Sequence, residues 1–231
     1  MADALYPRVC IGCGRNAGDA FRYVCWDCAT RIRYISGPRC SVCGEPVEGR
    51  VDHAFVCHGC RTDPRAYDAA RSACRYDDVA RDAMQTFKYD RGVWLNPDLS
   101  AMLLTCFTTE FDAMGFDGIV GVPLHPARRR ARGYNQAHLL GRTLAKRVGV
   151  PMWTHALVRV RATPSQTRLT APQRASNVRG AFSVFRATLV ADRQILLVDD
   201  VMTTGATVNE CARCLKEAGA ASVHVLTVAR G

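Results

Sequence analysis

The sequence predicts an α/β domain, built on a parallel sheet with helices on both faces, that follows a small cysteine-rich domain. Two patterns indicate this division. Eight of the twelve cysteines lie before residue 61, and beyond residue 66 apolar strands alternate with amphipathic helices. The Asp63-Pro64-Arg65 segment marks the expected boundary, which gives domains at 1–65 and 66–231. Of the 231 residues, 48% are hydrophobic, which is enough for a packed core.

The eight N-terminal cysteines form four Cys-x-x-Cys pairs, a spacing that places two sulfurs on one tetrahedral zinc ion. They are Cys10, Cys13, Cys25, Cys28, Cys40, Cys43, Cys57 and Cys60. Even pairs without a secretion signal favour zinc over disulfides. We therefore predict two structural Zn²⁺ ions in two tandem zinc ribbons. The spacing leaves open whether the pairs are used sequentially or interleaved, and His53 and His58 are expected to face solvent.

The second domain is predicted from an alternation of strands and helices. Strands are expected at 66–76, 117–123, 156–160, 182–185, 194–199 and 222–228. Helices are expected at 77–89, 98–114, 135–148 and 207–218. The polar stretch 161–180 is expected to be a loop. The four remaining cysteines are interpreted as packing residues, because buried thiols are common in cores: Cys74, Cys106, Cys211 and Cys214.

The segment 195–207, ILLVDDVMTTGAT, predicts a ligand site. Asp199 and Asp200 come at the end of a buried strand, where ligands bind in open α/β sheets. The loop that follows presents backbone N–H groups and hydroxyls at a helix start, which suits a phosphate. Its members are Thr203, Thr204, Gly205, Ala206 and Thr207. Because carboxylates accept hydrogen bonds from sugar hydroxyls, the expected ligand is a sugar phosphate.

The formal net charge of +10 is concentrated in one part of the chain. Residues 118–191 contain 13 Lys and Arg and no Asp or Glu, as an anion-binding surface requires. Two clusters of arginine stand out, and guanidinium groups pair bidentately with phosphate oxygens. The first follows a predicted strand and contains Arg128, Arg129 and Arg132; the second lies in the polar stretch and contains Arg168, Arg174 and Arg179.

Segment 195–207 resembles, at every position, the phosphoribosyl-pyrophosphate motif of type I phosphoribosyltransferases. The resemblance implies that Asp199 and Asp200 are the catalytic pair, binding the ribose 2′ and 3′ hydroxyls directly or through Mg²⁺. It implies that 203–207 wraps the 5′-phosphate. By position in that fold, Arg128, Arg129 and Arg132 would bind pyrophosphate. Arg168, Arg174 and Arg179 would belong to a flexible lid that closes over substrate.

The order of motifs along the whole chain is similar to that of the ComF family of competence-associated proteins. After the cysteine pairs come TFKY, VPLH, RRRARGYNQ, QTRL and RASNVRGAF, at 86–89, 122–125, 128–136, 166–169 and 174–182. This resemblance implies a role in the uptake of transforming DNA, with single-stranded DNA and DNA-uptake proteins as partners. It also implies binding of phosphoribosyl pyrophosphate with Mg²⁺.

Two functions stay open at this stage. One is a phosphoribosyltransferase-like protein; neither a general base nor a nucleobase pocket is recognisable, so the acceptor and turnover are unassigned. The alternative is a non-enzymatic single-stranded DNA-binding factor that uses the basic stretch 118–191, with Tyr134 or Trp153 stacking on bases. We expect no membrane span and a cytoplasmic location, because no apolar run is long enough and the start has no signal pattern.

Overall fold

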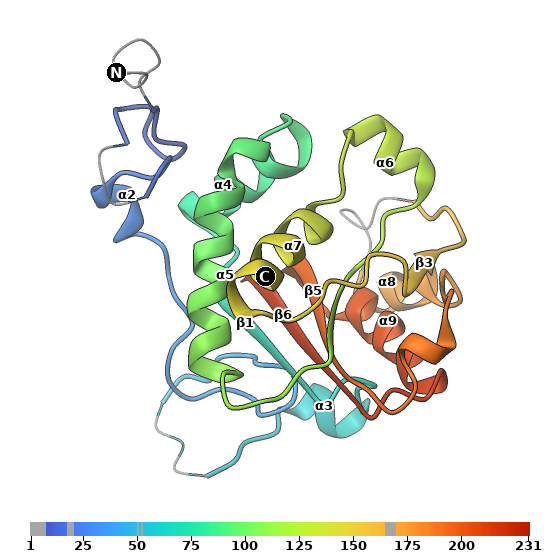
Figure 1. Cartoon of the computed structure of the whole chain (residues 1–231). Coiled ribbons are helices and arrows are strands. Elements are labelled where there is room, and N and C mark those ends of the chain that lie inside the picture. The colour runs from blue at the N-terminus through green and yellow to red at the C-terminus, as the bar shows by residue number, and fades with distance from the viewer. Residues whose placement is uncertain (1–7, 18–20, 50, 52, 165–169) are drawn as a thin grey trace.

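Four parallel strands form the central sheet, in the order β1-β6-β5-β2 (Figure 1). The computed structural model describes residues 8–17, 21–49, 51, 53–164 and 170–231. The strands are β1 (Ala69–Arg75), β2 (Gly118–Gly121), β5 (Gln194–Met202) and β6 (Ser222–Arg230). This confirms the predicted parallel α/β fold. β5 runs beyond its predicted end at 199, because pairing with β6 continues to Met202.

Helices cover both faces of the sheet, as predicted. On β5, Leu196 and Val198 face one core cluster whereas Ile195 and Leu197 face the other, which is the two-residue alternation of a strand. All four side chains are fully buried, because the sheet is covered on both sides. The first cluster contains α4 (Asp78–Tyr89), α5 (Asn96–Glu110) and α7 (Gln136–Val148); the second contains α9 (Ala206–Glu217).

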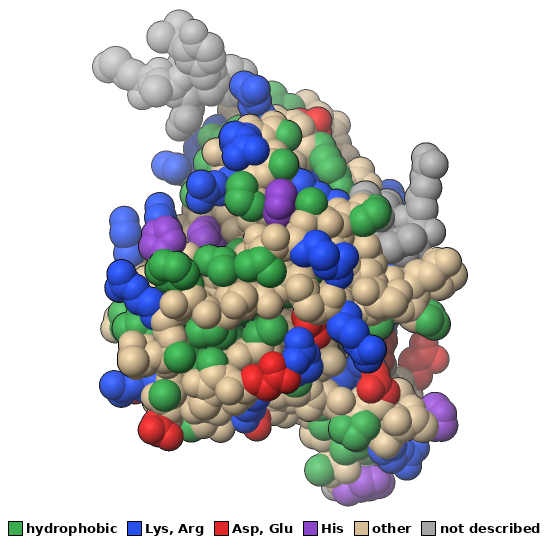
Figure 2. Space-filling model, turned by 90° about the vertical axis from the view of Figure 1, so that its right-hand side faces the viewer, with side chains coloured by type: hydrophobic (Ala, Val, Ile, Leu, Met, Phe, Trp, Pro, Cys, Tyr) green, Lys and Arg blue, Asp and Glu red, His purple; other side chains and the backbone are tan. Residues whose placement is uncertain are grey.

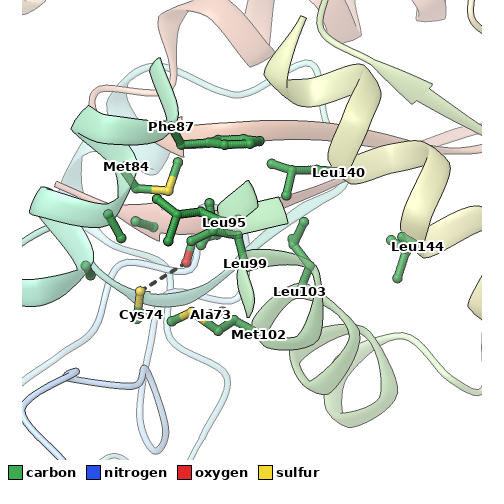
Figure 3. Close-up of a cluster of buried hydrophobic side chains, with 14 of the residues drawn as sticks. Ala73, Cys74, Met84, Phe87, Leu95, Leu99, Met102, Leu103, Leu140 and Leu144 are labelled. Carbon is green, nitrogen blue, oxygen red and sulfur yellow. Dashed lines mark hydrogen bonds between the residues drawn. The ribbon is translucent and has the colours of Figure 1, made fainter. Parts of the chain in front are cut away.

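The first cluster fixes α4 over the sheet (Figure 3). Met84 and Phe87 of α4 point toward Leu99 of α5 and Leu140 of α7, and all four are buried. Such side chains contribute roughly 1.5–3 kcal/mol each when removed from water. Lys88, the residue after Phe87, is therefore held in a defined place above the ends of the strands.

Two predicted strands lie outside the parallel sheet. β3 (Leu157–Arg159) and β4 (Phe182–Val184) pair antiparallel with each other. The stretch 161–180, which was expected to be a loop, contains the helix α8 (Ala171–Val178), and the arginine-rich segment after β2 forms the helix α6 (Pro126–Arg132). α8 begins with a capping box in which Thr170 and Gln173 satisfy each other's backbone N–H groups. Short 3₁₀ turns occur at η1 (Val93–Leu95) and η2 (Ala187–Leu189).

The cysteine-rich region packs against both ends of α5. It contains the short helices α2 (Trp26–Ala29) and α3 (His58–Thr62). Near the start of α5, the two carboxylate oxygens of Asp98 accept hydrogen bonds from the backbone N–H groups of Arg22 and Tyr23, at 2.9 and 2.7 Å. At its end, Glu110 forms an ion pair with Arg39. Cys10, Val24 and Cys28 also belong to the first core cluster, so the first ribbon packs directly against the α/β domain.

Within the ranges described above, no helix is both long and apolar enough to cross a bilayer.

Candidate functional site

Two clusters of four cysteines lie in the N-terminal region. The sulfurs of Cys10, Cys13, Cys25 and Cys28 lie within 4.8 Å of one another, as do those of Cys40, Cys43, Cys57 and Cys60. This geometry fits tetrahedral Zn²⁺ with four thiolate ligands. The first Cys-x-x-Cys pair joins the second, and the third joins the fourth. The pairs are therefore used sequentially and not interleaved, which the spacing had left open. The chain therefore carries two structural zinc sites, and His53 and His58 are exposed, as expected.

The second zinc site is fitted closely against the sheet. Gly44, directly after Cys43, has a φ of +70°. A Cβ atom there would lie 2.4 Å from the carbonyl oxygen of Ala70 in β1, so only glycine allows this approach. Arg230 of β6 donates from Nη1 to the carbonyl oxygen of Cys43 at 2.7 Å. These contacts make the zinc ribbon part of the structural support of the sheet.

A cleft of about 450 Å³ lies at the carboxyl ends of β2 and β5. Its walls come from α4, from α6 and the start of α7, from α8 and from the loop after β5. The sequence-predicted residues that line it are Asp199, Asp200, Thr203, Thr207, Arg128, Arg132 and Arg174. The sheet thus brings together the three predicted groups, the carboxylates, the hydroxyl loop and the arginines, at the edge where α/β ligands bind.

The two carboxylates differ in environment. Asp200 is 7% exposed, and its Oδ1 accepts a hydrogen bond from the backbone N–H of Val201 at 2.7 Å. Oδ1 of Asp199 accepts from the backbone N–H of Asp200 at 2.9 Å. Burial, and then the neighbouring charge of Asp200, raise the pKa of Asp199 to about 8. A cation or a hydrogen-bond donor from a ligand would stabilise the ionised pair.

Lys88 supplies a cation to this pair. Its Nζ lies 3.2 Å from Oδ1 of Asp200, and the two side chains are 18% and 11% exposed. Burial by itself would lower the pKa of Lys88, but the charges of Asp200 and Asp199 outweigh it and raise that pKa. No role was predicted for Lys88 from the sequence. Its only signal was the TFKY motif at 86–89.

The neighbours of Lys88 hold it in place. The carbonyl oxygen of Phe87 accepts hydrogen bonds from the Tyr134 hydroxyl and, at 3.3 Å, from Nε2 of Gln136. Gln136 is 2% exposed and begins α7, where Asn135 is the N-cap, accepting from the backbone N–H of His138 at 3.3 Å. The start of α7 therefore positions the end of α4.

The loop after β5 makes a tight turn that leads into α9. Gly205 adopts a φ of +77° and is the N-cap of α9. This positive φ is a conformation that favours glycine, and a Cβ there would also lie 2.8 Å from Cε of Met202. The Thr204 hydroxyl accepts from the backbone N–H of Ala206 at 3.4 Å. A small hollow of about 20 Å³ inside the loop is lined by Thr203, Thr204, Gly205, Ala206 and Thr207.

The predicted arginines separate into two groups. Nη2 of Arg128 donates to the carbonyl oxygen of Thr163 at 2.7 Å, and Nη1 of Arg174 donates to the Thr203 hydroxyl at 2.8 Å. Nη1 of Arg132 donates to Oε1 of Gln136 at 2.8 Å. These three arginines line the cleft. Arg129 and Arg179 are exposed and are not among its lining residues, and Arg168 lies outside the described residues.

Arg159 is a further cation of the cleft that the sequence analysis did not single out. It is 7% exposed, its guanidinium lies 5.1 Å from the centre of the Phe182 ring, and it donates to the Thr163 hydroxyl. Its Nε has no hydrogen-bond partner among the described residues. Burial, followed by the charge of Arg128, lowers its pKa. A ligand anion would compensate this poorly solvated cation.

The cleft has more cations than anions. Asp199 and Asp200 face five cationic side chains, which are Lys88, Arg128, Arg132, Arg159 and Arg174. The excess persists when both carboxylates are ionised. Such a site favours a ligand with several negative charges and a polar part that can donate hydrogen bonds to the carboxylates.

Comparisons with known proteins cover nearly the whole chain. Residues 1–61 match the family described as "Double zinc ribbon domain", and residues 135–231 match "Phosphoribosyl transferase domain". The chain is 30% identical over 225 residues to "Competence protein F" of Haemophilus influenzae, covering 96% of each chain. It is 31% identical over 221 residues to "DNA utilization protein YhgH" of Salmonella typhi, covering 90% of this chain and 96% of the relative.

A solved structure also overlaps with part of the chain. The glutamine phosphoribosylpyrophosphate amidotransferase of B. subtilis, complexed with ADP and GMP, is 22% identical. The match covers 63% of this chain and 30% of that one, with a TM-score of 0.43.

Proposed function

Because the chain belongs to the ComF family of competence proteins, we propose that its cleft binds phosphoribosyl pyrophosphate together with Mg²⁺. One observation carries the proposal. The carboxylates of Asp199 and Asp200, the loop 203–207 and five cations line or adjoin a single cleft at the end of β5. A phosphorylated sugar with a diphosphate has hydroxyls that can donate to the carboxylates and a phosphate that fits the loop. Its diphosphate supplies negative charge for the cations.

Each group of residues has a place in this proposal. The backbone N–H groups of 203–207 hold the 5′-phosphate at the start of α9. Asp199 and Asp200 accept from the ribose hydroxyls. Arg128, Arg159 and Arg174 neutralise the pyrophosphate. In a transfer reaction they would stabilise the negative charge that develops on the leaving pyrophosphate. Phosphoribosyl transfer is the reaction class that such a site would serve, with its acceptor unassigned.

The carboxylates also suit Mg²⁺. This ion is commonly held by one or two carboxylates together with substrate phosphates. Asp199 and Asp200 would hold it directly or through ribose hydroxyls, and the ion would supply neutralising charge to the diphosphate. Asp199, which is half-buried with a raised pKa, gains most from a nearby cation.

Titration calorimetry with phosphoribosyl pyrophosphate, with and without Mg²⁺, tests the proposal. We expect saturable binding that strengthens with Mg²⁺ and is lost in an Asp199→Asn/Asp200→Asn double variant. Asp192→Asn is the matched control, because Asp192 is an exposed acid just before β5 and its φ of +60° suits asparagine. Equal binding by the double variant and the control would refute the assignment.

Single-stranded DNA is a second candidate ligand, in line with relatives named for competence and DNA utilization. The basic stretch 118–191 favours it, because phosphate contacts supply most non-specific affinity. Figure 2 shows Lys and Arg side chains distributed over the face it presents, with most of the acidic ones in its lower half. A role in DNA uptake would also involve partner proteins of that process.

The stacking residues expected from the sequence are poorly placed for DNA. Tyr134 is half-buried, its hydroxyl donates to Phe87, and its ring centre lies 5.9 Å from that of Phe87. Trp153 lies against β2, where a Cβ on Gly118 would come within 2.4 Å of the indole.

A filter-binding titration with a 15-nucleotide oligothymidylate from 50 to 300 mM salt tests the DNA candidate. Affinity should fall steeply with salt, and a flat salt dependence would exclude the phosphate-contact mechanism.

A further inference from the structure

The segment 89–94, which runs from the last residue of α4 into η1, exposes several large apolar side chains beside the cleft. Tyr89, Val93 and Trp94 are 65%, 41% and 39% exposed. We call this segment the aromatic loop. Tyr89 also lines the cleft that contains Lys88 and Asp200, so the loop begins where the ligand site ends. Exposed apolar groups that adjoin a binding cleft commonly belong to an interaction surface.

The backbone of the aromatic loop is firmly hydrogen-bonded. The N–H groups of Asp90 and Gly92 both donate to the carbonyl oxygen of Thr86, each at 3.1 Å. A Cβ on Gly92 would lie 2.8 Å from that same oxygen, so the turn requires glycine. Immediately after the loop, Leu95 is fully buried. The outward position of Tyr89 and Trp94 is therefore fixed by the fold.

Cations and a second ring support these two aromatic side chains. The guanidinium of Arg132 lies 5.3 Å from the centre of the Tyr89 ring. The ring of Trp94 meets that of Tyr23 from the first zinc ribbon edge-on, with centres 4.5 Å apart. Arg91, between the two aromatics, is exposed. Rings alternating with guanidinium groups can hold stacked bases and the phosphates between them.

We propose that the aromatic loop is a stacking platform for the bases of single-stranded DNA, which it leads from the first zinc ribbon toward the cleft. The inference rests on the DNA candidate of the previous subsection and names the surface involved. Arg91 and Arg132 contact the phosphates, while Tyr89 and Trp94 stack on bases. Asp90, exposed beside Tyr89, opposes the DNA backbone and limits the affinity.

Three alanine variants test the platform, with fluorescence anisotropy of a labelled 15-nucleotide oligothymidylate as the measurement. Tyr89→Ala and Trp94→Ala should each weaken binding about 5- to 150-fold, the range of a lost base-stacking contact. Phe185→Ala is the matched control, because Phe185 is a 66% exposed aromatic outside the aromatic loop. It should bind as the wild type does. Tyr89→Phe keeps the ring and should restore affinity.

Two additional probes separate stacking from charge or folding effects. An abasic 15-mer of the same backbone should bind the wild type more weakly, and the Tyr89 and Trp94 variants should lose little further affinity for it. Asp90→Asn should strengthen oligothymidylate binding at low salt. Circular dichroism and phosphoribosyl pyrophosphate binding of Trp94→Ala establish that the variant is folded.

The possible failures are distinguishable. If the wild type does not bind the oligonucleotide, the DNA candidate falls and this inference falls with it. If the wild type binds but Tyr89→Ala, Trp94→Ala and Phe185→Ala all match it, DNA binding stands and the platform is refuted. If the abasic strand binds as tightly as oligothymidylate, bases are not read and the platform is likewise refuted.

Discussion

Nζ of Lys88 lies 3.2 Å from Oδ1 of Asp200, which joins a helix of the cleft wall to the acidic end of β5. The pair is largely buried, so removing one partner would leave the other uncompensated. Lys88 therefore supplies a cation from the protein itself beside Asp199 and Asp200. Any Mg²⁺ at the two carboxylates must share them with it.

Substitution of Lys88 tests this competition. Lys88→Met removes the cation, so the affinity of the carboxylate pair for a divalent ion should rise at least about tenfold, given the strength of a charge at such distance. Mn²⁺ binding measured by electron paramagnetic resonance reports it without need for activity. Lys88→Arg keeps the charge and should bind Mn²⁺ as the wild type does. Weaker Mn²⁺ binding in Lys88→Met would contradict the competition.

Asp98 is predicted to hold the first zinc ribbon on the α/β domain. Asp98→Asn removes one of the two acceptors used by the backbone of Arg22 and Tyr23, and should lower the free energy of unfolding by about 1–3 kcal/mol. Urea denaturation measures this, and faster tryptic cleavage near Arg22 should accompany it. Asp82→Asn, at an exposed ion pair with Arg81, serves as control and should change stability by under about 1 kcal/mol.

His138 predicts a specific pH dependence of stability. Burial lowers the pKa of His138 from 6.5 to about 4. A hydrogen bond with the backbone of Gly121 opposes this shift, and nearby cations reinforce it. Between these values the unfolded chain binds more protons, so stability is lost as pH falls. At pH 5 the loss should be about 2 kcal/mol relative to pH 7.5.

A His138→Gln variant isolates this contribution. Urea denaturation at pH 7.5 and pH 5 should show a smaller difference in the free energy of unfolding for the variant than for the wild type. Other groups, including the zinc ligands, titrate equally in both proteins. An identical pH difference would show that His138 does not contribute it.

Zinc removal should destabilise more than the N-terminal region. Cys40 is fully buried and belongs to the same core cluster as Val225 of β6. Cys40→Ser should therefore lose the second of the two zinc ions and also lower the melting temperature of the whole chain. Elemental analysis and calorimetry measure the two effects. A separate, unshifted transition of the α/β domain would show instead that the domains unfold independently.

The acidic pair and the loop of the site were predicted in detail because one continuous segment encodes them, whereas Arg128, Arg132 and Arg174 were predicted from charge pattern and position in the fold. In 195–207 the strand, the two carboxylates and the glycine turn are neighbours in the chain, so a local pattern specifies them. The capping box at Thr170 and Gln173 was equally local, and it was a readable signal for α8 that the loop prediction overlooked. The positions of β3 and β4 were predicted, but their antiparallel pairing was not.

The sequence by itself determined the eight zinc ligands, the acidic pair and the Thr/Gly loop 203–207, because short-range spacing fixes their geometry. Only the tertiary structure decided that zinc pairing is sequential, that Lys88 reaches Asp200, and that Arg159 and Tyr89 line the cleft. The contacts of Lys88, Arg159 and Tyr89 join residues far apart in the chain. They depend on how α4, α7 and the β3–β4 pair pack around the sheet, which is a collective result of core packing that no local pattern contains.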